Sequence, residues 1–212
     1  MLLNFNRLKE KYNMNIKGII HIGAHYGEEF QSYANNNIRD LIFFEPVPST
    51  FEILKENLQG KAILVNKALG NDTRKIEMNI ETANNGQSSS ILTPDIHLKQ
   101  YPHIQFNSTI EVDMIKLDDF MNEYYSFGYM GEPAAFNLIN IDVQGYELEV
   151  FKGAKDYLKQ VDYIITEVNR DEVYKGCAKV DELDSFLSGY GFERVETTWD
   201  GGTWGDAFYV KR

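Results

Sequence analysis

The sequence has one cysteine, no long apolar run and few basic residues, and each scarcity excludes a class of protein. Cys177 alone cannot form a disulfide within the chain, which is typical of a reducing compartment. No segment reaches the ~18 apolar residues that a membrane-spanning helix needs, and residues 1–15 lack the apolar core of a signal peptide. These features predict a cytoplasmic protein without a membrane partner.

Acidic residues outnumber basic ones by 32 to 21, which gives the 212-residue chain a formal net charge of -11. An acidic surface repels phosphate backbones, and no basic stripe offsets this repulsion, so no nucleic-acid partner is expected. Hydrophobic residues make up 43% of the chain, an ordinary share for a globular protein. The length predicts one domain, residues 1–212.

The first third of the chain alternates short apolar runs with helical patterns. The expected elements, in chain order, are a helix at 2–12, a strand at 18–23, a helix at 28–36, a strand at 40–45, a helix at 48–58 and a strand at 62–66. This alternation predicts a parallel sheet with helices on its faces.

Residues 74–115 interrupt the alternation. Residues 74–80 and 109–115 alternate polar and apolar side chains, whereas 82–94 are rich in Asn, Gly, Ser and Thr. We therefore expect an insertion made of two antiparallel strands around a long loop. Loops this long usually serve a function, and this one is expected to close over a substrate as a lid.

The strand and helix pattern then resumes. The expected elements, in chain order, are a strand at 135–142, a helix at 146–158 broken near Gly153, a strand at 162–168, a helix at 180–188 and a terminal hairpin of strands at 192–199 and 206–210. The whole predicts a doubly wound α/β fold. Such sheets bind ligands beyond the carboxyl ends of their strands, near the point where strand order reverses.

A turn with two glycines, Gly23-Ala24-His25-Tyr26-Gly27, follows the first strand. Glycine lets the backbone turn sharply and approach a ligand. A dinucleotide-binding turn would have glycine where His25 stands, and a histidine side chain would crowd a pyrophosphate. The turn therefore favours a nucleoside ligand that carries no phosphate.

Carboxylates follow two of the expected parallel strands. Glu45 ends the second strand and could accept hydrogen bonds from both ribose hydroxyls of NAD or of S-adenosylmethionine. Asp142 ends the fourth strand, beside the first, over the same crevice. There it could hold a cationic end of the cofactor, bind a cation, act as a base, or only cap the next helix.

The order of these motifs resembles the FkbM family of methyltransferases from about Gly18 to Lys211. The matching segments are His21-Ile22-Gly23-Ala24-His25-Tyr26-Gly27, Glu45-Pro46, Asn66-Lys67-Ala68-Leu69-Gly70, Gly86-Gln87-Ser88-Ser89-Ser90, Leu117-Asp118, Ile141-Asp142-Val143-Gln144-Gly145-Tyr146-Glu147, Phe151-Lys152-Gly153-Ala154, Glu167-Val168 and Trp204-Gly205-Asp206. Their order and spacing, more than any single motif, make the match.

The resemblance implies a Rossmann-like class I methyltransferase fold. Its sheet has seven mostly parallel strands, the last one antiparallel, and here the small β insertion follows the third strand. The resemblance also implies S-adenosylmethionine as methyl donor and a hydroxyl of a sugar, glycan or other small molecule as acceptor. The residues that it assigns to the cofactor are His21, Gly23, Ala24, His25, Gly27, Glu45, Asn66, Ala68 and Asp142.

Three residues depart from the family pattern. His21 stands in place of an acid, which changes or removes a contact to the cofactor's amino group. His25 replaces asparagine, and Gln144 replaces glutamate, so a charge near the crevice is lost. These departures leave open a non-catalytic binding module, and Glu45 leaves open an NAD-binding oxidoreductase, which His25 disfavours.

Methyl transfer to a hydroxyl requires a group that aligns the oxygen and takes its proton. Asp142 and Glu167 close neighbouring strands, so they could share a proton or a divalent cation, and His25 is a further candidate base. His97 and His103 are expected as exposed loop residues. Aromatic candidates for a sugar-binding wall are Tyr101, Phe106, Tyr124, Tyr125, Phe127 and Tyr129. The oligomeric state cannot be read from the sequence.

Overall fold

The computed structural model describes residues 2–126 and 136–212. Its main sheet has the strand order β3-β2-β1-β7-β8-β10-β9. These strands are β1 (Gly18–Ile22), β2 (Asp40–Phe44), β3 (Ile63–Val65), β7 (Leu138–Ile141), β8 (Tyr163–Asn169), β9 (Phe192–Asp200) and β10 (Trp204–Lys211). The strands from β3 to β8 pair in parallel, and β10 is antiparallel to both of its neighbours. This order and direction confirm the expected class I methyltransferase fold.

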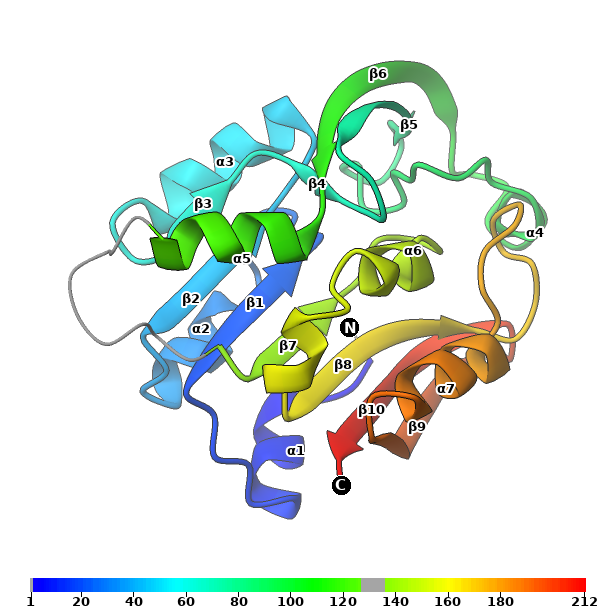
Figure 1. Ribbon diagram of the computed structural model, residues 1–212. Helices are drawn as coiled ribbons and strands as arrows, with labels where there is room; N and C mark the ends of the chain where they lie inside the picture. Colours follow the sequence, from blue (N-terminus) through cyan, green and yellow to red (C-terminus); the bar gives the residue numbers. More distant parts are fainter. Residues whose placement is uncertain (1, 127–135) are drawn as a thin grey trace.

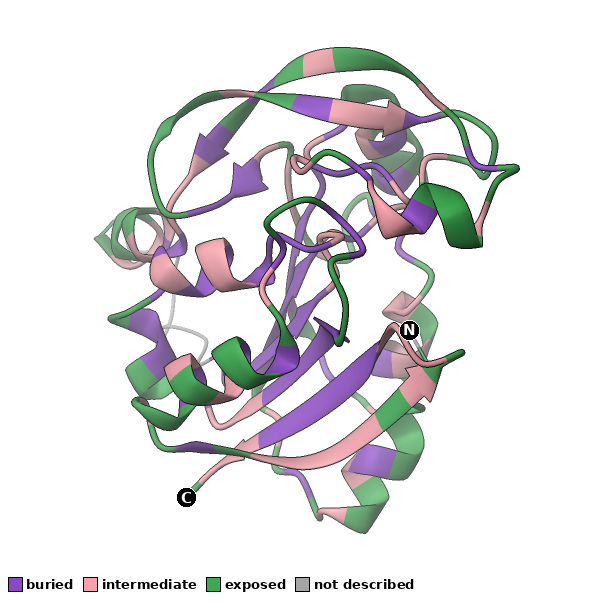
Figure 2. Ribbon diagram, turned by 90° about the vertical axis from the view of Figure 1, so that its right-hand side faces the viewer, coloured by how far each residue is buried: buried purple, intermediate pink, exposed green. Residues whose placement is uncertain are grey.

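Helices cover both faces of the sheet (Figure 1). One face carries α1 (Phe5–Lys11), α2 (Phe30–Asn35) and α3 (Pro48–Leu58), and the other carries α5 (Leu117–Ser126), α6 (Glu147–Lys152) and α7 (Val180–Ser188). Successive side chains of a strand point to opposite faces, so Ile20 and Ile22 of β1 join one core while Ile19 joins the other. The inner strands are accordingly buried along their length (Figure 2).

A second sheet of three strands lies above the main one in Figure 1, in the order β4-β6-β5. It consists of β4 (Ala68–Leu69), β5 (Arg74–Glu81) and β6 (Phe106–Ile115). The antiparallel pairing of β5 with β6 confirms the expected insertion. The short strand β4, which pairs in parallel with β6, was not predicted.

The loop of the insertion contains a helix that the sequence pattern did not predict, α4 (Ile96–Gln100). Long-range contacts hold it. The backbone N–H groups of Asp95 and His97 both donate to the carbonyl oxygen of Val173, and Pro94 forms a bridge with Tyr174. Figure 1 shows the loop after β8 rising to meet α4. A helix fixed by residues so distant in the chain leaves little local signal.

The expected break near Gly153 is confirmed, because α6 ends at Lys152 and the 3-10 helix η1 (Tyr157–Gln160) follows it. A Cβ atom on Gly153 would lie 1.9 Å from the carbonyl oxygen of Gly70. Glycine thus lets α6 touch the base of the insertion. Within the described residues, no helix is long and apolar enough to cross a membrane.

Candidate functional site

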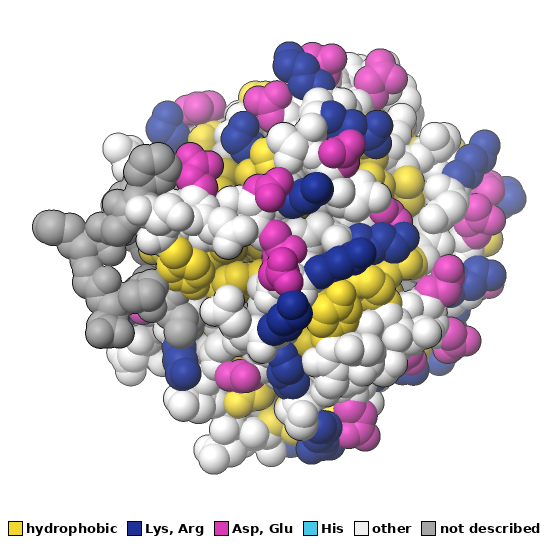
Figure 3. Space-filling model, viewed as in Figure 1, with side chains coloured by type: hydrophobic (Ala, Val, Ile, Leu, Met, Phe, Trp, Pro, Cys, Tyr) yellow, Lys and Arg dark blue, Asp and Glu magenta, His cyan; other side chains and the backbone are white. Residues whose placement is uncertain are grey.

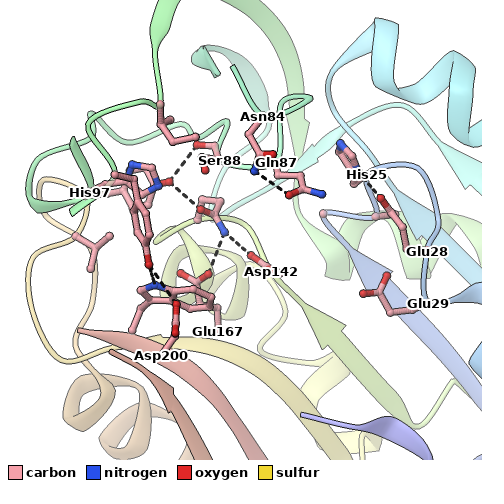
Figure 4. Close-up of a pocket in the computed structure, with 18 of the residues that line it drawn as sticks. His25, Glu28, Glu29, Asn84, Gln87, Ser88, His97, Asp142, Glu167 and Asp200 are labelled. Carbon is pink, nitrogen blue, oxygen red and sulfur yellow. Dashed lines mark hydrogen bonds and ion pairs between the residues drawn. The ribbon is translucent and has the colours of Figure 1, made fainter. Parts of the chain in front are cut away.

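A cavity of about 620 Å³ lies at the carboxyl ends of the parallel strands (Figure 4). Its walls come from the loops after β1, β7 and β8, from the insertion and from the β9–β10 hairpin. A narrower pocket adjoins it and shares Gly23, His25 and Asp142 with it. The narrower pocket extends to the ends of β2 and β3.

Most residues expected to bind the cofactor line one of these two spaces. They are His21, Gly23, Ala24, His25, Glu45, Ala68 and Asp142. Gly27 and Asn66 line neither. Asn66 instead donates from Nδ2 to the carbonyl oxygens of Glu45 and Pro46, at 2.8 and 3.0 Å, and thereby fixes the loop after β2.

The two glycines of the first turn serve packing. Gly23 has a φ of +78°, and a Cβ atom there would lie 1.9 Å from the carbonyl oxygen of Asp142. Gly27 has a φ of +83°, and its Cβ atom would lie 2.8 Å from Leu58 of α3. Glycine thus makes room for the β7 loop at position 23 and for α3 at position 27, while Gly23 also lines both spaces.

Glu45 is buried at the end of β2, with 5% of its surface exposed. Its two carboxylate oxygens each accept a backbone N–H at 2.9 Å, one from Val47 and one from His25. Burial raises the pKa of Glu45 to about 7, although these hydrogen bonds act in the opposite direction. Each oxygen has a second lone pair, and Glu45 lines the narrower pocket, so the carboxylate is suited to ribose hydroxyls.

Gln144 connects the acids that end β7 and β8. Its Nε2 donates to Asp142 Oδ1 at 2.7 Å and to Glu167 Oε2 at 2.9 Å, and its Oε1 accepts the Tyr174 hydroxyl at 2.7 Å (Figure 4). Its backbone carbonyl accepts the Ser90 hydroxyl at 2.7 Å, and its φ of +56° is rare for glutamine. We call Asp142, Gln144, Glu167 and Tyr174 the Gln144 bridge.

Glu147 adds a third carboxylate, which sequence reasoning did not assign to the site. Oxygen atoms of Asp142, Glu147 and Glu167 all lie within 4.8 Å of one another. Glu147 Oε1 accepts the backbone N–H groups of Val143 and Gly145, at 3.0 and 3.1 Å. Burial, reinforced by the charge of Asp142, raises the pKa of Glu147 to about 7 and that of Glu167 well above its ordinary value. Three such oxygen donors are a chemically suitable set for a hard divalent cation.

His25 links the first turn to the insertion. Its Nδ1 lies 2.7 Å from Glu28 Oε1, and its Nε2 lies 2.9 Å from the carbonyl oxygen of Asn85. Burial lowers the pKa of His25, but the hydrogen bonds to Glu28 and Asn85 outweigh it and raise that pKa above its ordinary value. Both ring nitrogens face acceptors, so in this arrangement neither offers a lone pair to an acceptor hydroxyl.

His21 is buried in β1, where the family pattern has an acid. The Tyr33 hydroxyl accepts a hydrogen bond from Asn140 and lies at hydrogen-bond distance, 3.0 Å, from His21 Nδ1. Burial lowers the pKa of His21, which is therefore neutral at pH 7. Its Nε2 lies 4.0 Å from Glu29 Oε2, and Glu29 lines the cavity. Sequence reasoning missed Glu29, which follows the glycine turn by two residues.

Aromatic rings form the side of the cavity away from the glycine turn. Trp204 Nε1 donates to the Tyr101 hydroxyl at 3.0 Å, and that hydroxyl donates to Asp200 Oδ2 at 3.2 Å. The His97 ring packs 5.1 Å from the Tyr101 ring and 5.3 Å from the Tyr174 ring, measured between centroids. His97 is therefore buried, and the prediction of an exposed residue was wrong because α4 packs against the loop after β8.

The other predicted wall residues lie elsewhere. Phe106 packs with Val173 and Tyr174, and Tyr124 and Tyr125 pack against the main core. Phe127 and Tyr129 fall outside the described residues. His103 is exposed, as expected, at the rim of the cavity. Trp204 and Asp200 were not predicted as wall residues, and only their position in the hairpin turn hinted at the site.

Residues 21–194 match the family model described as the methyltransferase FkbM domain. The chain is 28% identical over 180 residues to the 2-O-methyltransferase NoeI of Sinorhizobium fredii, a match that covers 79% of this chain and 71% of the relative. It is 26% identical over 129 residues to the hexuronic acid methyltransferase AglP of Haloferax volcanii, which covers 59% of this chain and 46% of that protein. The chain thus spans less than half the length of the second relative.

Among solved structures, the fold resembles magnesium protoporphyrin IX methyltransferase from Synechocystis with bound S-adenosylmethionine. The TM-score is 0.53 at 8% identity, and the match covers 98% of this chain and 76% of the other. At such low identity the likeness concerns the fold.

Proposed function

Since this chain belongs to the FkbM methyltransferase family, we propose that it transfers a methyl group to a hydroxyl oxygen of a sugar or a related small molecule. The chain is an S-adenosylmethionine-dependent methyltransferase. The family assignment does not favour an NAD-binding oxidoreductase or a non-catalytic module. The names of the two relatives, a 2-O-methyltransferase and a hexuronic acid methyltransferase, support the choice of acceptor.

The proposal assigns the nucleoside part of the cofactor to the narrower pocket. Glu45 would accept the ribose hydroxyls, and the small residue Ala68 leaves room beside it. On the cavity side of this pocket, Glu29 would face the positive charges of the cofactor. S-adenosylmethionine supplies a methyl carbon that is activated by the positively charged sulfur.

Asp142 is the base in this proposal. It would take the proton of the acceptor hydroxyl as that oxygen receives the methyl group, which bound S-adenosylmethionine would supply while its sulfur keeps the bonding electrons. Gln144 and Glu167 are positioning residues, because the Gln144 amide fixes both carboxylates at hydrogen-bond distance. His25 also positions, since it ties the first turn to the insertion loop.

The observation that carries the proposal is the place of Asp142, which lines both the nucleoside pocket and the larger cavity. A base for methyl transfer must stand where the cofactor and the acceptor meet. In this proposal the Gln144 amide, and not a cation, holds Asp142 and Glu167 together. The amide nitrogen donates to both carboxylates and lies between them, where a bridging cation would bind.

Asp142→Asn tests the proposal, with Asp40→Asn, an exposed site at the opposite end of the strands, as control. The kcat of Asp142→Asn is expected to fall by about 10²–10⁴-fold while its Kd for S-adenosylmethionine changes little. Wild-type activity should persist in a chelator. An unchanged kcat with a much weaker Kd would leave Asp142 as a cofactor ligand only. Activity that a chelator abolishes and Mg²⁺ restores would instead assign the carboxylates to a cation.

A further inference from the structure

The cavity has acidic side chains and no lysine or arginine among the residues that line it. Its carboxylates belong to Glu28, Glu29, Asp142, Glu167 and Asp200. Residues 127–135, which lie outside the described residues, also contain no lysine or arginine. The outer surface differs, because basic and acidic side chains alternate over the face seen in Figure 3. The absence of basic side chains is thus a property of the cavity.

The histidines do not replace the missing cations. Burial lowers the pKa of His21 and of His97, so both are neutral at pH 7. His25 is paired with Glu28 at 2.7 Å. His103 lies at the exposed rim. The guanidinium group of Arg170, in the loop after β8, is stacked 3.8 Å from the centroid of the Trp199 ring and does not line the cavity.

Most of the cavity's carboxylates already have partners. Gln144 bridges Asp142 and Glu167, and His25 binds Glu28. Glu29 and Asp200 have no lysine or arginine partner within the described residues, and Figure 4 places them on opposite sides of the cavity. Glu29 lies beside the glycine turn, on the cofactor side. Asp200 is therefore the carboxylate of the cavity that is left to bind the acceptor.

The surroundings of Asp200 suit a cation. Asp200 is exposed at the end of β9; its Oδ2 accepts a hydrogen bond from the Tyr101 hydroxyl, and within the described residues its Oδ1 takes part in no hydrogen bond. Tyr101 and Trp204 line the cavity next to it, and the faces of such rings attract positive charge. A carboxylate or phosphate on the acceptor would be repelled by Asp200 and would find no lysine or arginine among the lining residues, whereas an ammonium group would form a charged hydrogen bond with Asp200.

We propose that the acceptor is an amino sugar, a sugar with an ammonium group and no negative charge, and that Asp200 binds the ammonium group. The proposal rests on the sugar methylation proposed above and narrows its substrate class. It separates this chain from a relative whose name specifies hexuronic acid as its substrate.

Four methyl glycosides of one ring type test the proposal: the glucosaminide, the N-acetylglucosaminide, the glucoside and the glucuronide. Release of S-adenosylhomocysteine at pH 7 gives kcat/KM for each glycoside. The glucosaminide is expected to exceed the two neutral glycosides by about two- to fivefold, as for one exposed charge pair, and the glucuronide to stay at background.

Asp200→Asn should lower kcat/KM for the glucosaminide about two- to fivefold and leave the N-acetylglucosaminide unchanged, and Asp200→Lys should raise the glucuronide above the glucosaminide. Asp181→Asn, an exposed carboxylate on α7, is the matched control. If glycosides are methylated but the glucuronide equals the glucosaminide, or Asp200→Asn affects both sugars equally, the amino-sugar proposal is wrong. If no glycoside is methylated by wild-type protein that binds S-adenosylmethionine, the proposed sugar methylation itself fails.

Discussion

Replacing Gln144 by glutamate tests whether a neutral amide is needed between Asp142 and Glu167. The substitution keeps the size of the side chain and turns a donor, 2.7 and 2.9 Å from the two carboxylates, into an acceptor. Two charged oxygens at such a distance repel by about 6 kcal/mol at an effective dielectric constant of about 20. Protonating a carboxyl group with a pKa of about 4.3 at pH 7 costs less, about 3.7 kcal/mol, so the folded variant should take up one proton.

The protonated carboxyl group of the Gln144→Glu variant donates one hydrogen bond where the amide donates two. One hydrogen bond to a charged group is worth about 1.5–3 kcal/mol, so together with the cost of proton uptake the total loss of stability at pH 7 should be about 5–7 kcal/mol. The new carboxyl group has a higher pKa in the folded than in the unfolded state. The folded variant therefore binds more protons than the unfolded variant. Its loss of stability relative to wild type should grow as pH rises above about 4.3, and should be smaller at pH 5 than at pH 8.

Urea unfolding at pH 5.5 and pH 8, followed by tryptophan fluorescence, measures both effects. Gln59→Glu, at an exposed position, should change neither value by more than about 0.5 kcal/mol. Gln144→Met removes the donors without adding a charge, so its deficit should grow less steeply with pH than that of Gln144→Glu. A Gln144→Glu variant as stable as wild type at pH 8, or one with the same deficit at both pH values, would refute the reasoning.

Three further predictions concern the same site. Glu45→Gln should weaken S-adenosylmethionine binding by about 1.5–3 kcal/mol in calorimetry, and unchanged affinity would remove Glu45 from the cofactor pocket. Because the pKa of Glu45 is raised to about 7, wild-type affinity should fall from pH 8 to pH 6, and Glu45→Gln should lack this dependence. Gly23→Ala should lower the Tm by several degrees, since its Cβ atom meets the Asp142 carbonyl oxygen, and a wild-type Tm would contradict that contact. Tyr174→Phe should lower kcat a few-fold with little change in cofactor Kd, and equal losses in both would place Tyr174 at the cofactor instead.

The fold could be predicted where strands are short apolar runs ended by glycine, proline or a carboxylate. The strands β1 and β2 and the helix α3 follow from such patterns. Helix α5 also has a local signal that was overlooked, since Leu117, Phe120, Met121 and Tyr124 recur at helical spacing and pack against the core. Helix α4 has no comparable signal, because contacts with the loop after β8 hold its five residues.

The site was predictable to the extent that strand ends determine it. Glu45 and Asp142 line the two spaces because carboxyl ends of parallel strands meet at one edge of a sheet. The contacts that orient them were not predictable. Gln144 and its hydrogen-bond partner Tyr174 are 30 residues apart in the sequence, and His25 and its partner Asn85 are 60 residues apart. No local pattern specifies pairs of such separation.

The buried trio of His21, Tyr33 and Asn140 has a consequence for how this sequence can change. These side chains come from β1, α2 and β7 and are joined by hydrogen bonds through the tyrosine oxygen. Restoring an acid at position 21 alone would bury a carboxylate in a place shaped for a neutral imidazole. The substitution becomes tolerable only after Tyr33 or Asn140 has changed, so the effects of the three positions are not additive. An acid at position 21 should therefore lower stability more when introduced alone than when introduced together with changes at Tyr33 and Asn140.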